Sequence, residues 1–238
     1  MGTIRATSPN GFVSGEQRAY LITGATGFLG RHIIESLRKA RPQARVVVLV
    51  RNAEAWQSQS WRDEAGDVDV VTGSLFRADD WKNDSRLDSI DGIFHLAAMV
   101  QHSRSAPEEM IRVNVEGTAN MVRLAAEKKC RIVFASSSGT VGCSRDAAAR
   151  PNEEAPFCEN DVAGFPYYSS KIQAEKKARA LADELNVELV VFRPPVMLGP
   201  KDHRFRSTAN VLRLLRGKLP FLLEGELAQS VVDTIAID

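Results

Sequence analysis

The sequence has no long hydrophobic run and no excess of charge of one sign. No apolar stretch approaches the roughly 18 residues that a membrane-spanning helix needs. Its 31 lysines and arginines are matched by 30 aspartates and glutamates, which gives a formal net charge of +1. Without a basic surplus, the composition does not support binding to nucleic acid or to an acidic membrane. We therefore expect a protein with no membrane span and no nucleic-acid partner.

The amino-terminal segment also lacks the features of a targeting sequence. Residues 1–17 are polar, contain glycine and serine, and have no apolar core of the kind found in signal peptides. We expect them to form a flexible tail. Cysteine is scarce, and the spacing of Cys130, Cys143 and Cys158 does not match a metal-ligand pattern. This usage favours the reducing cytoplasm, with no disulfide framework and no bound metal.

Strand-like and helix-like segments alternate along the 238 residues, of which 44% are hydrophobic and 26% charged. Short apolar runs predict strands at 19–23, 44–50, 68–71, 93–96, 131–135 and 187–192. Helical spacing of apolar residues predicts helices at 28–40, 107–129 and 167–185. This alternation predicts an α/β fold, namely a Rossmann-type doubly wound parallel sheet with helices on both faces. The pattern changes after residue 200, so we expect a dinucleotide-binding domain at 18–200 and a partial substrate-binding lobe at 201–238.

Three glycines lie where the first predicted strand turns into the first predicted helix. Gly24, Gly27 and Gly30 have the spacing G-x-x-G-x-x-G. At such a turn the first glycine permits a tight bend, the second lets the backbone approach a pyrophosphate, and the third lets helix and strand pack closely. The amides at the start of the helix then face the anion, aided by the helix dipole. We infer a dinucleotide site that includes this turn.

The end of the second strand distinguishes NAD from NADP. An acidic residue at this position hydrogen-bonds the ribose 2′-hydroxyl of NAD. This chain has Leu-Val-Arg-Asn at 49–52, without a carboxylate. The planar guanidinium of Arg51 can instead pair with the 2′-phosphate of NADP. We therefore predict NADP as the cofactor. If Arg51 is instead a solvated surface arginine, NAD is the alternative.

A Tyr-x-x-x-Lys pair follows the fifth predicted strand. Tyr167 and Lys171 are four residues apart, so both side chains lie on one face of the predicted helix. Free tyrosine has a pKa of about 10, and an adjacent ammonium favours the phenolate, which allows proton exchange with a substrate oxygen. The run of serines at 136–138 ends the fifth strand, at the edge where ligands bind in such sheets. One of these hydroxyls can hold the same oxygen.

Together these motifs make the sequence similar to the extended short-chain dehydrogenase/reductase family, the NAD(P)-dependent epimerase/dehydratase group. The resemblance covers residues 18–200 and continues more weakly to the end. Its motifs occur in the family's order, as TGATGFLG at 23–30, GSL at 73–75, HLAA at 95–98, NVEGT at 114–118, SSS at 136–138, YYSSK at 167–171 and RPPV at 193–196. Within the family, the chain looks most like the dihydroflavonol-4-reductase-like and 3β-hydroxysteroid dehydrogenase-like branches.

The resemblance implies roles for the catalytic residues. Tyr167 would be the general acid/base, and Lys171 would lower the pKa of Tyr167 and bind the nicotinamide ribose. The family pattern places the catalytic hydroxyl three residues before the valine of the serine motif, which selects Ser138. Ser137 is the alternative, because some reductase branches shift this position by one. Asn114 would tie a helix to a neighbouring strand.

The resemblance also implies a set of cofactor contacts. They come from the glycine turn, the ends of the second to fourth strands, the Tyr-x-x-x-Lys pair and the segment after the sixth strand. These residues are Gly24, Thr26, Gly27, Phe28, Leu29, Gly30, Arg51, Ser74, Leu75, Leu96, Ala97, Ala98, Tyr167, Lys171, Pro194 and Val196. Ser74 departs from the family, since an aspartate usually reaches the adenine amine from this position.

Three functions remain open for the chain, each with a small molecule as its partner. The first is an NADP-dependent oxidoreductase that transfers a hydride on a carbonyl/alcohol substrate. The second is an NAD-dependent sugar-nucleotide epimerase or dehydratase. The third is a truncated, non-catalytic dinucleotide-binding module, because family members are usually longer and the substrate lobe is expected to be truncated here. The family often forms homodimers through helices near 107–129 and 167–185, and we expect the same.

Overall fold

The computed structural model describes residues 18–100, 107–144, 146, 148–202, 212–213, 215–218 and 234–236. The predicted tail at 1–17 lies outside the described residues, and so does most of the predicted lobe at 201–238. Nearly all of the predicted dinucleotide-binding domain is described, and the candidate site is built from it.

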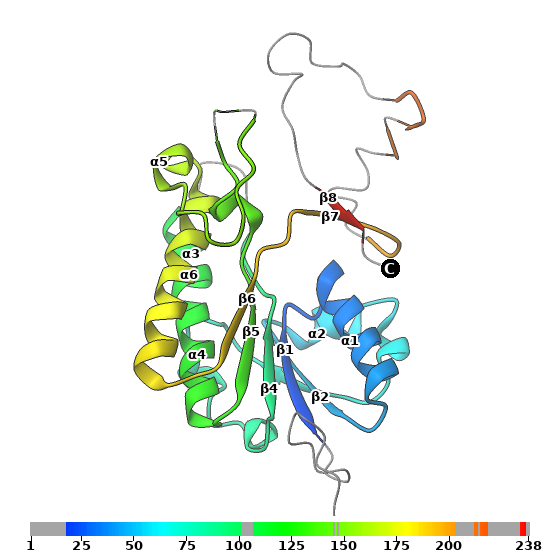
Figure 1. The fold of residues 1–238 in the computed structure, drawn as a ribbon. Helices are drawn as coiled ribbons and strands as arrows, with labels where there is room; N and C mark the ends of the chain where they lie inside the picture. Colours follow the sequence, from blue (N-terminus) through cyan, green and yellow to red (C-terminus); the bar gives the residue numbers. More distant parts are fainter. Residues whose placement is uncertain are drawn as a thin grey trace, which may run out of the picture.

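A six-stranded parallel sheet forms the centre of this part of the chain (Figure 1). Its strand order is β3-β2-β1-β4-β5-β6, and every neighbouring pair is parallel. The strands are β1 (Ala19–Thr23), β2 (Arg45–Val50), β3 (Val68–Thr72), β4 (Gly92–His95), β5 (Arg131–Ala135) and β6 (Leu189–Phe192). The prediction of a Rossmann-type sheet is confirmed. The direction of winding reverses between β1 and β4, where sheets of this kind bind their ligands.

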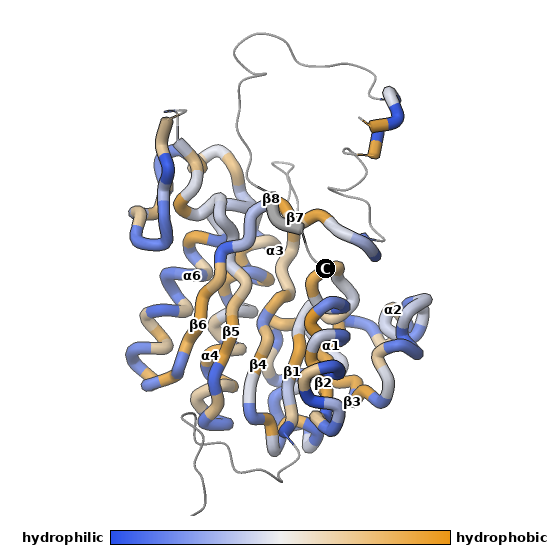
Figure 2. The backbone as a smooth tube through the Cα atoms, turned by 45° about the vertical axis from the view of Figure 1, so that its right-hand side comes forward, coloured by the Kyte–Doolittle hydropathy of each residue, from blue (hydrophilic) through white to orange (hydrophobic). Residues whose placement is uncertain are grey.

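Helices cover both faces of the sheet. One face carries α1 (Phe28–Ala40) and α2 (Ala53–Gln57), whereas the other carries α3 (Pro107–Ile111), α4 (Gly117–Glu127) and α6 (Pro166–Leu185) (Figure 1). Neighbouring side chains of a strand point to opposite faces. Leu21 therefore packs in the core under α4 and α6, and Ile22 in the core under α1. Figure 2 shows the resulting hydrophobic strands, which are typical of a parallel sheet buried on both faces.

Shorter elements complete the described part of the chain. The turn η4 (Arg112–Glu116) is π-helical and joins α3 to α4, and α5 (Glu159–Val162) precedes α6. The 3-10 turns are η1 (Arg62–Ala65), η2 (Ala78–Asp80), η3 (Ser85–Leu87) and η5 (Ser138–Thr140). A separate parallel pair is formed by β7 (Val196–Leu198) and β8 (Thr234–Ala236). Within the described ranges, no helix combines the length and apolarity needed to cross a membrane.

Candidate active site

The glycine turn between β1 and α1 has no room for side chains. Gly24 has a φ of +75°, and a Cβ there would lie 2.7 Å from the backbone nitrogen of Ala97. A Cβ at Gly30 would lie 2.3 Å from the carbonyl oxygen of Gly24, which also accepts a 2.9 Å hydrogen bond from the Gly27 amide. Gly27 is the N-cap of α1 and has no side chain to compete for the first amides of the helix. The turn therefore fits a pyrophosphate group. Three other predicted contacts belong to the same stretch, namely Thr26, Phe28 and Leu29.

The segment after β4 lies directly against this turn. The amide of Ala97 donates a 3.2 Å hydrogen bond to Oγ1 of Thr23, whose oxygen also lies 2.8 Å from Nδ1 of His95. Burial, with a smaller contribution from Lys171, lowers the pKa of His95 to about 3, so the imidazole stays neutral and acts as a packing residue. The predicted contacts of this segment are all half-buried, and they are Leu96, Ala97 and Ala98. They border the switch point between β1 and β4.

The ends of β2 and β3 place the residues predicted for the adenosine end of the cofactor. Arg51 follows β2 and is exposed, and Ser74 follows β3 and is half-buried. Leu75 is buried in the core instead, because it packs against Gly117 at the start of α4. A Cβ added to Gly117 would lie 2.8 Å from Cβ of Leu75. Arg51 and Ser74 can therefore present polar side chains to a ligand, whereas the side chain of Leu75 is buried in the core.

Tyr167 meets a serine from the end of β5, although not the one that the family pattern selects. The side chain of Ser137 lies beside the Tyr167 hydroxyl, where it favours the phenolate and so acts to lower the Tyr167 pKa. Ser138 opens the turn η5, where its amide donates to the carbonyl oxygen of Pro194 at 3.1 Å. Ser137, the alternative to Ser138, is thus the serine that acts on Tyr167 in this arrangement. Burial and the neighbouring Tyr168 raise the pKa of Tyr167 to about 12, while the Ser137 side chain acts in the opposite direction.

Lys171 lies on α6, one turn after Tyr167, and is only 2% exposed. Its ammonium donates a 2.7 Å hydrogen bond to the carbonyl oxygen of Ala135 and lies 4.6 Å from the centre of the Phe134 ring. Burial lowers the pKa of Lys171 to about 7, although the charge of Glu175 opposes this shift. The ammonium is thus held at the carbonyl oxygen of Ala135, at the end of β5.

Asn114 and the segment after β6 complete the edge of the site. The Asn114 amide binds both backbone groups of Met99 and donates to Oγ of Ser170 at 2.9 Å, so it ties the segment after β4 to α6. Pro194 is half-buried after β6, and Val196 opens β7 with a partly exposed side chain. Pro194 and Val196 therefore follow the carboxyl end of β6.

A buried charge that the sequence motifs do not indicate lies behind Lys171. Glu175 is 0% exposed and accepts a 2.6 Å hydrogen bond from Oγ of Ser136. It also forms ion pairs with Arg179 and Arg193. The sequence does contain a sign of this contact, since Glu175 follows Lys171 at the same four-residue spacing that separates Lys171 from Tyr167.

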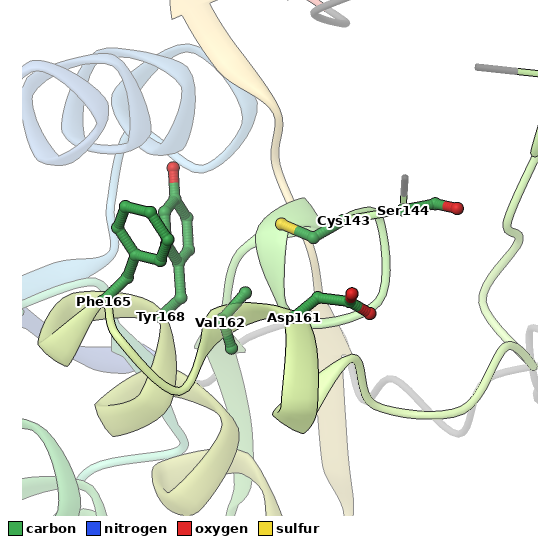
Figure 3. Close-up of a pocket in the computed structure, with 6 residues that line it drawn as sticks. All are labelled: Cys143, Ser144, Asp161, Val162, Phe165 and Tyr168. Carbon is green, nitrogen blue, oxygen red and sulfur yellow. The ribbon is translucent and has the colours of Figure 1, made fainter. Parts of the chain in front are cut away.

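A cavity of about 250 Å³ opens beside Tyr168, the neighbour of Tyr167 (Figure 3). The ring centres of the two tyrosines are 5.2 Å apart. Apolar groups come from Val162, Phe165 and Tyr168, and Figure 3 shows Ser144 and Asp161 at the other end of the cavity. The cavity also includes Cys143. Among the described residues, no group of three or more His, Cys, Asp or Glu side chains could hold a metal ion.

The match to a family model settles the family. The model described as the NAD dependent epimerase/dehydratase family matches residues 20–230. The chain belongs to this family. The resemblance inferred from the glycine turn, the serine run and the Tyr-x-x-x-Lys pair is therefore confirmed at the level of the family.

Curated relatives include plant reductases. The chain is 32% identical to dihydroflavonol 4-reductase of Zea mays over 78% of its length, and 32% identical to cinnamoyl-CoA reductase 2 of Medicago truncatula over 86%. It spans 54% and 62% of the lengths of these two relatives. Among solved structures, DesIV, a dTDP-glucose 4,6-dehydratase of Streptomyces venezuelae with NAD and TYD bound, superposes with a TM-score of 0.67 at 25% identity. That alignment covers 84% of this chain and 62% of DesIV.

Proposed function

We propose that the chain is an NADP-dependent reductase that converts a carbonyl compound to an alcohol. The observation that carries this proposal is the position of the Ser137 side chain beside the Tyr167 hydroxyl, next to the apolar cavity at Tyr168. Two hydroxyls in contact can hold one substrate oxygen and give it a proton. The similarity to dihydroflavonol 4-reductase and cinnamoyl-CoA reductase supports this choice within the family.

Tyr167 is the proposed proton donor. Its raised pKa keeps the phenol protonated at neutral pH, which suits the reduction of a carbonyl group. Negative charge develops on the carbonyl oxygen as the carbon is reduced. Tyr167 transfers its proton to this oxygen, and the Ser137 hydroxyl donates a hydrogen bond to it. Ser137 thus replaces Ser138 as the proposed third member of the catalytic set.

The residues at the carboxyl edge of the sheet fit a dinucleotide. When bound, the nicotinamide cofactor supplies the hydride. The turn at 24–30 would hold the pyrophosphate, and the exposed Arg51 would pair with the 2′-phosphate of NADP. Lys171 would bind the nicotinamide ribose, and Pro194 and Val196 would contact the nicotinamide end.

The lining of the cavity favours a substrate with a flat apolar or aromatic group. Phe165 and Tyr168 present their rings at 6.4 Å between centres, and Val162 adds an aliphatic side chain. Aromatic rings pack well against such surfaces. We propose that this group enters the cavity while the carbonyl oxygen reaches Tyr167.

An NAD-dependent sugar-nucleotide epimerase or dehydratase is the alternative function. The family assignment and the likeness to DesIV favour it. Such an enzyme returns the hydride to its substrate and consumes no cofactor. The sequence at 49–52 argues against it, because no carboxylate is present there to bind the ribose 2′-hydroxyl of NAD. A non-catalytic module is disfavoured by the Ser137–Tyr167 contact.

Cofactor oxidation tests the proposed function. The chain is mixed with NADPH or NADH and a panel of aromatic aldehydes and ketones, and absorbance at 340 nm is followed. We expect oxidation of NADPH with at least one carbonyl compound, and a loss of roughly 100-fold or more in Tyr167→Phe. Tight binding of NAD with no net oxidation of either reduced cofactor would favour the epimerase or dehydratase instead.

A further inference from the structure

Three successive residues at the end of β5 contact three residues that share one face of α6. Ala135 accepts a hydrogen bond from Lys171, Ser136 donates to Glu175, and Ser137 lies beside the Tyr167 hydroxyl. The three helical partners are four residues apart, which places them on one side of a helix. Two of these contacts involve proposed catalytic residues, and the third involves Glu175.

Glu175 joins three elements that carry the site. Its Oε2 accepts from Oγ of Ser136 at 2.6 Å, and the carboxylate accepts from Nη2 and Nε of Arg193 at 2.6 and 3.1 Å. Ser136 follows β5 and Arg193 follows β6, while Glu175 itself belongs to α6. The amide of Ser136 also donates to the carbonyl oxygen of Phe192 at 2.8 Å. A single carboxylate therefore holds the carboxyl ends of two strands against the catalytic helix.

Glu175 is charged in spite of its burial. Burial acts to raise its pKa, but the hydrogen bonds from Arg193, Ser136 and Arg179 outweigh this effect and bring the pKa below its ordinary value. Burying a carboxylate is costly even when it is paired, and an apolar cluster of the same volume is often at least as stable. Stability alone therefore gives little reason for a charge here, whereas precise placement of the neighbouring groups does.

The geometry points to Glu175 as a positioning residue, which fixes the distance and orientation of Ser137, Tyr167 and Lys171 by clamping Ser136 and Arg193. This inference rests on the proposed reductase function for its catalytic consequence. Ser136 is bonded to Ser137 in the chain, so a shift of Ser136 moves the hydroxyl that meets Tyr167. A displacement of about 1 Å in a catalytic group can cost roughly 100-fold in rate.

Glu175 also acts on the charge of Lys171. Among the described residues, the titratable groups that interact with the Lys171 ammonium are Glu175 on α6 and His95 on β4, whereas β5 places the Phe134 ring and the Ala135 carbonyl against it. His95 is neutral because burial lowers its pKa to about 3. Burial lowers the Lys171 pKa to about 7, and Glu175 supplies a negative charge that opposes this shift and favours the protonated form of Lys171.

The test compares Glu175→Gln and Ser136→Ala with Arg179→Ala. Arg179 binds the same carboxylate from the surface, with its side chain 49% exposed, and provides the matched control. Turnover with NADPH gives kcat and KM, and thermal unfolding gives Tm. A ¹⁵N NMR titration of the Lys171 Nζ, assigned with Lys171→Arg, reports the protonation of Lys171 without any turnover.

Glu175→Gln is expected to lower kcat by roughly 10- to 100-fold, with the KM for NADPH within about twofold of the parent. The Lys171 titration midpoint should move to lower pH, because a neighbouring negative charge is lost. Ser136→Ala keeps the buried ion pair and is expected to lower kcat about 10-fold, with a smaller loss of Tm than Glu175→Gln. If Glu175→Gln does not fold, the kcat of Ser136→Ala tests the positioning role of Glu175 instead. Arg179→Ala should stay within about twofold of the parent in both kcat and KM.

Two results would overturn the inference. One is a folded Glu175→Gln with the kcat and Lys171 midpoint of the parent, or a Ser136→Ala with unchanged kcat. The other is a loss of kcat that follows the loss of Tm in every variant and leaves the Lys171 midpoint in place. If the parent chain itself turns over no carbonyl compound, the proposed function fails, and the Lys171 midpoint in Glu175→Gln then decides the role of Glu175 alone.

Discussion

Ser137 presents its side chain to the Tyr167 hydroxyl, whereas the next residue, Ser138, directs its amide to the carbonyl oxygen of Pro194 at 3.1 Å. The two serines thus have separate tasks at the end of β5. One hydroxyl shares the proposed substrate oxygen with Tyr167, and the other residue links β5 to the segment after β6. The backbone bond of Ser138 does not need its side chain, so the two positions respond differently to alanine.

Ser137→Ala is expected to lower kcat by roughly 100-fold or more, because a hydrogen bond to the developing oxyanion is lost. Ser138→Ala is the matched control, and its kcat should fall by no more than about threefold. Steady-state reduction of a carbonyl compound by NADPH measures both variants. A larger loss in Ser138→Ala than in Ser137→Ala would restore the assignment made from the family pattern.

Lys171→Met is expected to lose activity and to gain stability. Burial lowers the pKa of Lys171 to about 7 from an ordinary value of 10.5, so the unfolded chain binds more protons between these two pH values. The stability of the parent therefore rises with pH across this window. At pH 7 and below, the parent carries the full cost of the buried ammonium, and Lys171→Met should raise the free energy of unfolding by roughly 1–3 kcal/mol.

Denaturant unfolding at several pH values checks this expectation. The gain in Lys171→Met should shrink as the pH rises towards 10, because the parent then buries a neutral amine. Lys177, which is exposed on the same helix, provides the control, and Lys177→Met should stay within about 0.5 kcal/mol of the parent at every pH. A gain in Lys171→Met that is the same at pH 7 and pH 10 would contradict the depressed pKa.

Arg51→Ala is expected to weaken NADPH binding by roughly 10- to 100-fold and to leave NADH binding nearly unchanged. A hydrogen bond from a charged donor to the 2′-phosphate accounts for a difference of this size. Calorimetric titration with each cofactor provides the measurement, and Arg62→Ala serves as the control because Arg62 is an exposed arginine paired with Asp63. Equal losses for both cofactors, or none, would remove the basis for NADP selectivity at Arg51.

Gly24→Ala is expected to damage the phosphate turn. The positive φ of Gly24 strains any other residue, and the added Cβ would lie 2.7 Å from the amide of Ala97. We expect a lower Tm and a Kd for NADPH that rises more than about 10-fold. Gly164→Ala is the control, because a Cβ at Gly164 meets nothing within 4 Å. Unchanged NADPH binding in Gly24→Ala would place the pyrophosphate elsewhere.

The fold could be predicted because its determinants are local. The apolar runs predicted at 19–23 and 131–135 coincide with β1 and β5, and the other strands differ by one or two residues at their ends. The helix predicted at 107–129 contains the π-helical turn Arg112–Glu116, which apolar spacing does not reveal. Parallel pairing follows from the crossover helices, since short hairpins cannot join parallel strands.

The site was only partly predictable, because its remaining contacts are tertiary. The glycine turn and the Tyr-x-x-x-Lys pair stand out at short spacing, but which serine meets Tyr167 depends on how β5 ends against α6. The bond between Ser136 and Glu175 joins residues 39 positions apart. The charge of a neighbouring lysine alone predicts a lowered pKa for Tyr167, whereas burial raises this pKa to about 12.

Transfer of deuterium from NADPH to the product tests the central claim most directly. The chain is incubated with NADPH carrying deuterium at C4 of the nicotinamide and an aromatic carbonyl compound, and the product is analysed by mass spectrometry. The proposed reductase predicts an alcohol that contains one deuterium and forms in equal amount to the oxidised cofactor. An unlabelled product that forms with retained NAD and no net oxidation would contradict the account and establish the epimerase or dehydratase chemistry instead.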